Sequence, residues 1–222
     1  MKHRFLVLIL VTFSVGMAAQ KISIDPEISM LVLGDSYSIG ESVEEKQRWP
    51  NQFVVALREL GIEANEPDYI ATTGWTTTQL IQGIDKYLNR EKRYNLVSIL
   101  IGVNNQYQGI DISTYEPDLT KIVDKALDVL KQDSSKIFML SIPDYAFTPF
   151  GDGKPSISNE IDAYNAINKR VAAKYNICYI DITPLSRTGL NNPSLVAGDG
   201  LHPSGLQYGE WVQKVLPLLD LF

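Results

Sequence analysis

The strongest constraint on the fold is a regular alternation of short apolar runs with segments of helical periodicity. The apolar runs lie at residues 29–34, 68–73, 96–102, 137–142 and 177–182. Several of them are continuously apolar, which is typical of strands that are covered on both faces. The pattern predicts an α/β fold with three α/β/α layers, in which a doubly wound sheet of five parallel strands is covered by helices.

The segments between these runs carry the apolar stripes of amphipathic helices. Pro50 is suited to the first turn of one helix, and Gly61 is suited to its end. Two further stripes run through residues 119–130 and 161–175. A last helix is expected from about Gly205 to the C-terminus.

The first 19 residues have a different character. A basic head, MKHR, precedes the apolar run FLVLILVTFSVGM, and small residues follow at Gly16, Ala18 and Ala19. This order predicts a secretory signal peptide over residues 1–19, cleaved after Ala18 or Ala19, followed by one folded domain over residues 20–222. The run is short for a transmembrane helix. An uncleaved anchor or a buried first strand is the alternative. We therefore expect a secreted or periplasmic protein.

The charge balance excludes several classes of partner. The chain has 20 basic and 26 acidic residues; the first 19 residues hold Lys2 and Arg4 and no acid, so cleavage leaves 18 against 26, a net charge of −8. An acidic chain without a basic cluster is a poor ligand for nucleic acid or an anionic membrane surface. No later apolar stretch is long enough to span a bilayer, and we expect a monomer.

Two scarce residue types limit the possible chemistry. The single cysteine, Cys178, lies in the apolar run ICYIDI and is interpreted as a small buried thiol. The two histidines are His3, inside the signal segment, and His202. A metal site built from several histidines is therefore excluded, and we expect no metal or cofactor.

Polar residues follow the predicted strands at one edge of the sheet. Ser36 follows the first strand, Gly74 the second and Asn104 the third, while Asp199 and His202 lie in the long segment after the fifth. In open parallel sheets, ligands bind beyond the carboxyl ends of the strands. We therefore expect these five residues to meet.

Acyl transfer needs this set of groups. A serine hydroxyl is a weak nucleophile until an imidazole takes its proton, and an acid fixes the imidazole tautomer. Asp199 and His202, three residues apart, could sit on one helical turn. The oxyanion that forms needs fixed donors, such as a glycine N–H and an asparagine amide. Each residue alone has an ordinary structural explanation, such as a helix cap or a turn. The combination and its order favour catalysis.

These motifs resemble the SGNH hydrolase superfamily, also called the GDSL family of esterases and lipases. The matching blocks are GDSYS, TTGWT, GVNN and DGLH, in order, within residues 28–222. The resemblance implies that residues 20–222 form an SGNH hydrolase domain with a flavodoxin-like fold, with Ser36 as nucleophile, His202 as base and Asp199 as the acid that orients it. It also implies an oxyanion hole formed by the Ser36 and Gly74 N–H groups and the Asn104 side chain.

The chain departs from the family pattern at two positions. Asn105 stands where the third block commonly has aspartate, and Ser38 stands where the first block commonly has leucine. Neither is one of the signature residues. The Asn105 difference is expected to change local electrostatics more than activity.

Aromatic residues close to these blocks are candidates for the substrate pocket. Tyr37, Trp75 and Tyr107 are the substrate-binding candidates, and the loop 142–153 adds further aromatics. Alternatively, these rings only pack the loops. The charged run 41–48 is interpreted as a solvated face, with a lid as the alternative.

The prediction from sequence is a serine esterase that acts through an acyl-enzyme. Its substrate would be a small-molecule, carbohydrate or lipid ester: a short-chain ester, an acetylated carbohydrate or a lysophospholipid. Two alternatives remain: an O-acyltransferase with the same site, and a non-catalytic carbohydrate- or lipid-binding module on the same fold.

Overall fold

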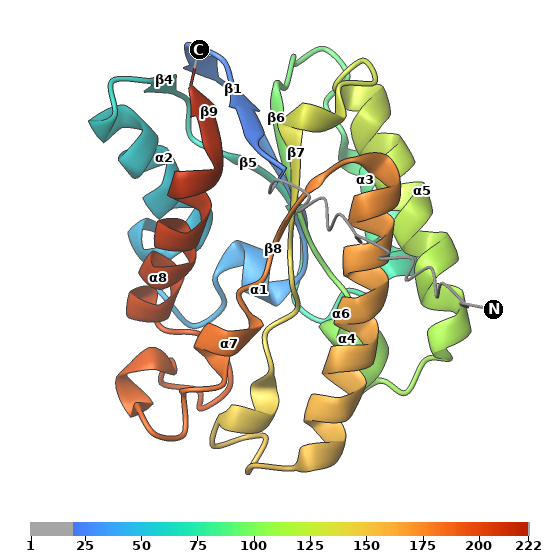
Figure 1. Cartoon of the computed structure of the whole chain (residues 1–222), viewed down its shortest axis with the longest axis vertical. Helices are drawn as coiled ribbons and strands as arrows, with labels where there is room; N and C mark the ends of the chain where they lie inside the picture. The colour runs from blue at the N-terminus through green and yellow to red at the C-terminus, as the bar shows by residue number, and fades with distance from the viewer. Residues whose placement is uncertain (1–19, 222) are drawn as a thin grey trace, which may run out of the picture.

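The computed structural model describes residues 20–221, and its centre is a five-stranded parallel sheet (Figure 1). Its strands are β3 (Met30–Gly34), β5 (Asp68–Ala71), β6 (Leu96–Leu100), β7 (Ile137–Leu140) and β8 (Cys178–Ile180). They pair in the order β5-β3-β6-β7-β8. All five strands expected from the sequence are confirmed, as is the doubly wound fold. The predicted signal segment lies outside the described residues.

Helices cover both faces of the sheet. Helices α2 (Trp49–Glu59) and α8 (Gly205–Val215) lie against one face (Figure 1). The other face carries α3 (Thr77–Tyr87), α5 (Tyr115–Val129) and α6 (Pro155–Tyr175). Every residue of β3, β6 and β7 is buried, which explains why their sequences are continuously apolar.

Short helices gather at the carboxyl ends of the strands. They are α1 (Ser36–Ile39), α4 (Val103–Tyr107) and α7 (Thr183–Ser186), which share the lower end of the sheet in Figure 1. The chain order reverses at β3, because its neighbours β5 and β6 lie on opposite sides of it. Such a reversal opens a crevice at the strand ends, and ligands bind there in folds of this kind.

The C-terminal segment differs from the prediction. Helix α8 ends at Val215, a 3₁₀ turn follows at Leu216–Leu218, and β9 (Leu219–Leu221) then pairs in parallel with β1 (Ile22–Ile24). The expected helix to the C-terminus is therefore wrong. Pro217 has no N–H to continue the α-helical hydrogen bonds.

One main helix and several small elements were not anticipated from the sequence. The clearest is α3, whose start carries a capping box between Thr76 and Gln79, a signal that is readable in the sequence. A second parallel pair joins β2 (Glu27–Ile28) to β4 (Glu63–Ala64). Further 3₁₀ turns span Glu45–Gln47, Ile112–Thr114, Ser134–Lys136, Tyr145–Phe147 and Pro193–Leu195. Between residues 20 and 221, no helix has the length and apolar character needed to cross a bilayer.

Candidate active site

The turn after β3 explains why this strand ends in Gly-Asp-Ser. A Cβ atom on Gly34 would lie 2.3 Å from the Leu100 carbonyl oxygen, so the close approach of β3 to β6 requires glycine. Asp35 caps α1, because its carboxylate accepts a hydrogen bond from the Tyr37 amide at 3.0 Å. Ser36 is therefore the first residue of α1, held beyond the carboxyl end of the strand.

The Asp35 carboxyl group is almost completely buried beside this serine. Burial raises the pKa of Asp35 from 3.8 to about 7, although hydrogen bonds from the Tyr37 amide and the Asn104 side chain act in the opposite direction. Near neutral pH, the two protonation states of this carboxyl group are therefore both populated. Sequence reasoning did not give Asp35 any role.

Gly74 follows β5 with a positive φ of 82°. A Cβ there would meet nothing within 4 Å, so the backbone conformation and not lack of space favours glycine. Its carbonyl oxygen accepts a hydrogen bond from Gln108 Nε2 at 3.1 Å. Its N–H finds no acceptor among residues 20–221 and remains available to a ligand.

Asn104 is the second residue of α4, just beyond β6. Its Nδ2 donates a hydrogen bond to the Trp75 carbonyl oxygen at 3.0 Å and lies 3.5 Å from Asp35 Oδ2. These contacts come from the turns that carry Gly74 and Ser36. The amide is therefore held between the two turns.

The neighbouring Asn105 has a different, structural environment. It is buried, its Oδ1 accepts a hydrogen bond from the Thr77 amide at 3.0 Å, and its Nδ2 donates to the Thr77 hydroxyl at 2.8 Å. The side chain thus anchors the start of α3. As an amide it does so without placing a charge at this buried position.

Asp199 and His202 lie in a loop and not on the helical turn suggested by their spacing. Asp199 Oδ1 accepts hydrogen bonds from the amides of Leu201 (2.9 Å) and His202 (3.0 Å), which bends the backbone into a tight turn. The carboxylate therefore shapes its own loop. Asp199 Oδ2 lies 2.6 Å from His202 Nδ1, the contact expected of an acid that orients the imidazole.

The environment of Asp199 favours its ionised form. Partial burial acts to raise the pKa of Asp199, but the hydrogen bonds from Ser42, from His202 and from the two backbone amides outweigh it and hold the pKa well below the usual range. The His202 ring is buried and packs at a tilt against Tyr37, with 5.4 Å between the ring centroids. Because Nδ1 faces the carboxylate, Nε2 is the nitrogen that remains for proton transfer.

Four of the five predicted signature residues line one cavity of about 250 Å³: Ser36, Gly74, Asn104 and His202. Asp199 lies behind His202 and is not part of the lining. The rest of the wall is mostly apolar and is formed by Tyr37, Thr73, Val103, Tyr107, Tyr145, Phe150 and Leu201. The structure therefore brings the predicted residues together at the switch point of the sheet.

The aromatic candidates separate into two groups. Tyr37 and Tyr107 line the cavity, whereas the Trp75 ring lies against Gly83 of α3, where an added Cβ would be 2.4 Å from it. Trp75 contributes its carbonyl group to Asn104 instead. Tyr107 and Phe150 are 59% and 49% exposed, so the open side of the cavity is aromatic.

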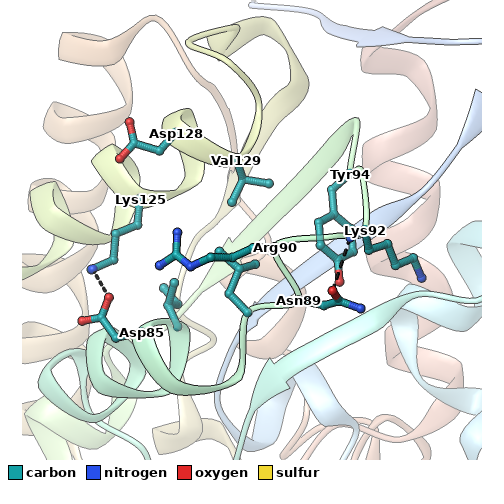
Figure 2. Close-up of a pocket in the computed structure, with 10 residues that line it drawn as sticks. Asp85, Asn89, Arg90, Lys92, Tyr94, Lys125, Asp128 and Val129 are labelled. Atoms are coloured by element: carbon teal, nitrogen blue, oxygen red, sulfur yellow. Dashed lines mark hydrogen bonds and ion pairs between the residues drawn. The ribbon is translucent and has the colours of Figure 1, made fainter.

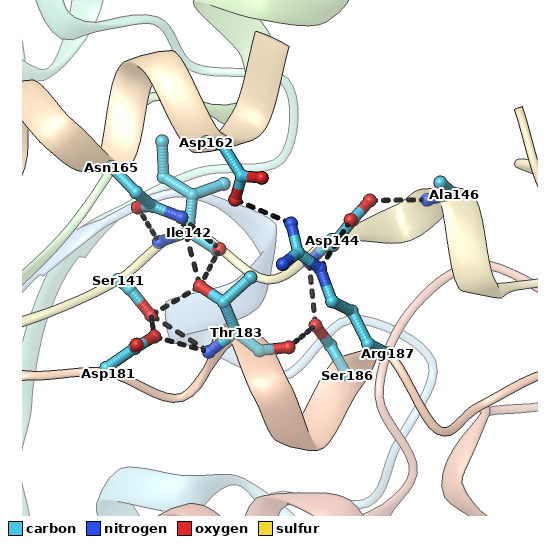
Figure 3. Close-up of polar contacts among 10 residues, drawn as sticks. All are labelled: Ser141, Ile142, Asp144, Ala146, Asp162, Asn165, Asp181, Thr183, Ser186 and Arg187. Carbon is cyan, nitrogen blue, oxygen red and sulfur yellow. Dashed lines mark hydrogen bonds and ion pairs between the residues drawn. The ribbon is translucent and has the colours of Figure 1, made fainter. Parts of the chain in front are cut away.

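A buried polar network fixes the loop that carries Tyr145 and Phe150 (Figure 3). Asp144 is completely buried; it accepts a hydrogen bond from Arg187 Nε at 2.9 Å and caps the turn Tyr145–Phe147. Arg187 also contacts Asp162 on α6 at 2.6 Å. These ion pairs hold the aromatic wall at the ends of β7 and β8.

A second cavity, which we call the α3–α5 cavity, has a similar volume of about 220 Å³ (Figure 2). Half of its ten lining residues are charged, and the others include Ile84, Leu88 and Val129. Lys125 of α5 pairs with Asp85 of α3, and the exposed side chain of Arg90 extends between these helices. The α3–α5 cavity contains none of the predicted site residues.

Among residues 20–221, no group of three or more His, Cys, Asp or Glu side chains is arranged to hold a metal ion. Cys178 is buried in β8, and burial raises the pKa of its thiol to about 11, which disfavours the nucleophilic thiolate.

Comparison with known structures agrees with this fold. The crystal structure of TesA aligns with a TM-score of 0.68 at 20% identity, over 86% of this chain and 98% of that one. An acetylxylan esterase, Axe2 from Geobacillus stearothermophilus, aligns with a TM-score of 0.67 at 18% identity, over 86% and 93% of the two chains. A lipase/acylhydrolase from Enterococcus faecalis aligns with a TM-score of 0.66 at 19% identity, over 87% of this chain and 97% of that one.

The family comparison is more specific. No curated protein matches the chain. The model of the GDSL-like lipase/acylhydrolase family matches residues 32–209, which include every predicted site residue from Ser36 to His202. The chain therefore belongs to the GDSL-like lipase/acylhydrolase family.

Proposed function

We propose that this protein is a serine esterase that hydrolyses carboxylic esters through an acyl-enzyme. One observation carries the proposal: Ser36, Gly74, Asn104 and His202 surround a single cavity, and Asp199 Oδ2 lies 2.6 Å from His202 Nδ1. A family of lipases and acylhydrolases is consistent with this chemistry.

In the first half of the reaction, Ser36 Oγ attacks the ester carbonyl carbon while His202 Nε2 takes the hydroxyl proton. The Asp199 carboxylate stabilises the imidazolium that forms. When the tetrahedral intermediate collapses, the ester C–O bond breaks and His202 returns the proton to the departing alcohol. The acyl group remains on Ser36.

In the second half, water takes the place of the alcohol. His202 removes a proton from water as the water oxygen attacks the acyl-enzyme, and the same proton is then returned to Ser36 Oγ. The carboxylic acid is released. The cycle needs no metal or redox group.

The developing oxyanion is stabilised by three donors: the N–H groups of Ser36 and Gly74 and the Asn104 amide. The Gly74 N–H has no acceptor among the described residues, and Asn104 Nδ2 uses one hydrogen on the Trp75 carbonyl group. Its second hydrogen has only the long 3.5 Å contact with Asp35. That hydrogen is the one offered to the oxyanion.

The size and lining of the active-site cavity favour a substrate with a small, uncharged acyl group. Its volume of about 250 Å³ is below the usual range for drug-sized ligands, and its walls are mostly apolar. The exposed rings of Tyr107 and Phe150 suit the larger alcohol part of the ester. Aryl esters of increasing chain length, assayed beside acetylated xylan and lysophospholipid, would identify the preferred substrate; activity that rises with chain length would contradict this proposal.

Labelling with a serine-reactive phosphonate tests the catalytic proposal. We expect one adduct, located on Ser36 by mass spectrometry, and loss of ester hydrolysis in proportion to labelling. A binding module would not react. An O-acyltransferase would also be labelled, but it would form an acylated sugar from a donor ester and an acceptor in preference to free acid.

We further propose that the protein acts outside the cytoplasm as a monomer. The layout of residues 1–19 supports secretion, and N-terminal sequencing of protein recovered from a native secreting host should begin at Ala19 or Gln20. An intact Met1 would contradict it. Sedimentation of the mature protein tests its oligomeric state.

A further inference from the structure

The charged run 41–48 begins with two residues that face the site. Ser42 Oγ donates a hydrogen bond to Asp199 Oδ2 at 2.7 Å, across 157 residues of sequence. The Glu41 carboxylate accepts a hydrogen bond from the hydroxyl of Thr73, which lines the active-site cavity and precedes Gly74. The start of this run is therefore more than a solvated face.

The backbone also ties this segment to the nucleophile. Gly40, in the left-handed conformation, caps the end of helix α1, and the Glu41 amide then donates to the Ser36 carbonyl oxygen at 3.0 Å. Glu41 and Ser42 consequently contact three separate parts of the site: the nucleophile helix, the Gly74 turn and the Asp199 loop.

Ser42 itself has a φ of 66°, in the left-handed region that residues with a Cβ rarely adopt. Such a conformation persists where surrounding contacts hold it. Here, two contacts hold the segment: the hydrogen bond from Ser42 to Asp199, and the hydrogen bond from Thr73 to the preceding residue, Glu41. The strained backbone aims the Ser42 hydroxyl at the carboxylate.

The oxygen that Ser42 contacts is the one that faces His202. Asp199 Oδ2 has two partners, Ser42 Oγ and His202 Nδ1, and Asp199 Oδ1 has two backbone amides. The two amides hold one end of the carboxylate. Among residues 20–221, Ser42 and His202 are the side chains that hydrogen-bond the other end.

We propose that Ser42 is a positioning residue that fixes Asp199 Oδ2 against His202 and so keeps the imidazole aligned with Ser36. The inference rests on the proposed esterase function. Ser42 acts through Asp199 and does not touch the reacting atoms.

The central variant is Ser42→Gly, which removes the hydroxyl but allows the positive φ. We expect kcat for a short-chain ester to fall about five- to tenfold, since an exposed hydrogen bond to a carboxylate is lost. KM should stay within about twofold, because substrate contacts are unchanged.

Ser42→Asn, which tolerates a left-handed backbone and keeps an N–H donor, should recover most of the activity. Lys131→Gly is the matched control, because Lys131 also has a positive φ of 54° but lies at the end of α5.

A double-mutant cycle separates positioning from simple stabilisation. In an Asp199→Asn background, Ser42→Gly should change kcat by less than about twofold, because the carboxylate through which Ser42 acts is gone. Equal effects in both backgrounds, or full kcat in a folded Ser42→Gly protein, would overturn the proposal. Wild-type protein that hydrolyses no ester in the panel would overturn the proposed function and this inference with it. Active wild type with an unaffected Ser42→Gly variant overturns only the role of Ser42.

Discussion

The active-site cavity and the α3–α5 cavity have nearly equal volumes, about 250 and about 220 Å³, but their side chains differ in kind. The active-site cavity presents a few short polar side chains, such as Ser36 and Asn104, at the ends of strands and within a mostly apolar wall. The α3–α5 cavity is lined by long charged side chains, among them Lys125 and the exposed Arg90 (Figure 2). Catalysis needs groups held within a fraction of an ångström, and flexible surface side chains do not provide this.

The position of each cavity explains the difference. Residues just beyond the end of a sheet strand have a position that the strand fixes, and the carboxyl ends of β5, β3 and β6 are neighbours where the chain order reverses. The α3–α5 cavity lies between two helices and the segment that leads into β6, where side chains point into solvent. Volume alone therefore does not identify the site; convergence of strand ends does.

The largest effect is expected from Ser36→Ala. Removing the nucleophile should lower kcat/KM by about 10⁴ or more, while residual binding and oxyanion donors leave slight activity. Initial-rate assays test this, and an unchanged thermal transition would show that the variant is folded. Full activity in the folded variant would remove the functional distinction between the two cavities.

Asp199→Asn should lower kcat by about 10³, because an amide cannot fix the required His202 tautomer or stabilise the imidazolium. Rates measured across pH 5–9 provide the check. The wild-type carboxylate stays charged throughout this range, because its hydrogen bonds hold the pKa of Asp199 far below it. A decrease in kcat of the Asp199→Asn variant that is confined to acid pH would therefore argue against this role.

Asn104→Ala should lower kcat by about 10²–10³ with a smaller change in KM, as expected for a donor used in the transition state. Steady-state kinetics on a short-chain ester measure both constants. A structural residue would show the opposite pattern, with a lower melting temperature and a nearly unchanged rate.

Asp35→Asn tests the burial of charge at the active-site cavity. The raised pKa of Asp35 means that the native state holds a proton between about pH 4 and 7 that the unfolded state has lost. Wild-type stability should therefore fall as pH rises through this window. Asparagine keeps an oxygen for the cap but does not ionise. In urea unfolding, the free energy of unfolding of the variant relative to wild type should be about 2–3 kcal/mol higher at pH 8 than at pH 5. A difference between the two proteins that does not change with pH would contradict the burial of this carboxyl group.

The sequence predicted the strands and the site better than the connections. Apolar runs identify buried strands, and polar residues at their ends identify the site, because both depend on local order along the chain. The parallel sheet then brings Ser36, Gly74 and Asn104 together without further information.

The remaining details depend on contacts across long stretches of sequence. The hydrogen bond of Ser42 to Asp199 spans 157 residues, and the packing of Trp75 depends on a helix that sequence reasoning missed. The role of Asn105 became visible only with its partner Thr77. Pairing between chain ends, as in β1 and β9, has no local signal.

The smallest effect is expected from Lys125→Met in the α3–α5 cavity. The Lys125 and Asp85 side chains are 29% and 54% exposed, and ion pairs of this kind contribute between 0 and about 1 kcal/mol to stability. Methionine keeps most of the apolar stem, so the free energy of unfolding should change by less than about 1 kcal/mol, and less still in high salt. Because this cavity holds no group that the reaction uses, kcat/KM should stay within about twofold of wild type, as it should in Arg90→Gln. A tenfold loss in either variant, with an unchanged melting temperature, would show that the α3–α5 cavity takes part in the reaction and would end the contrast between the two cavities.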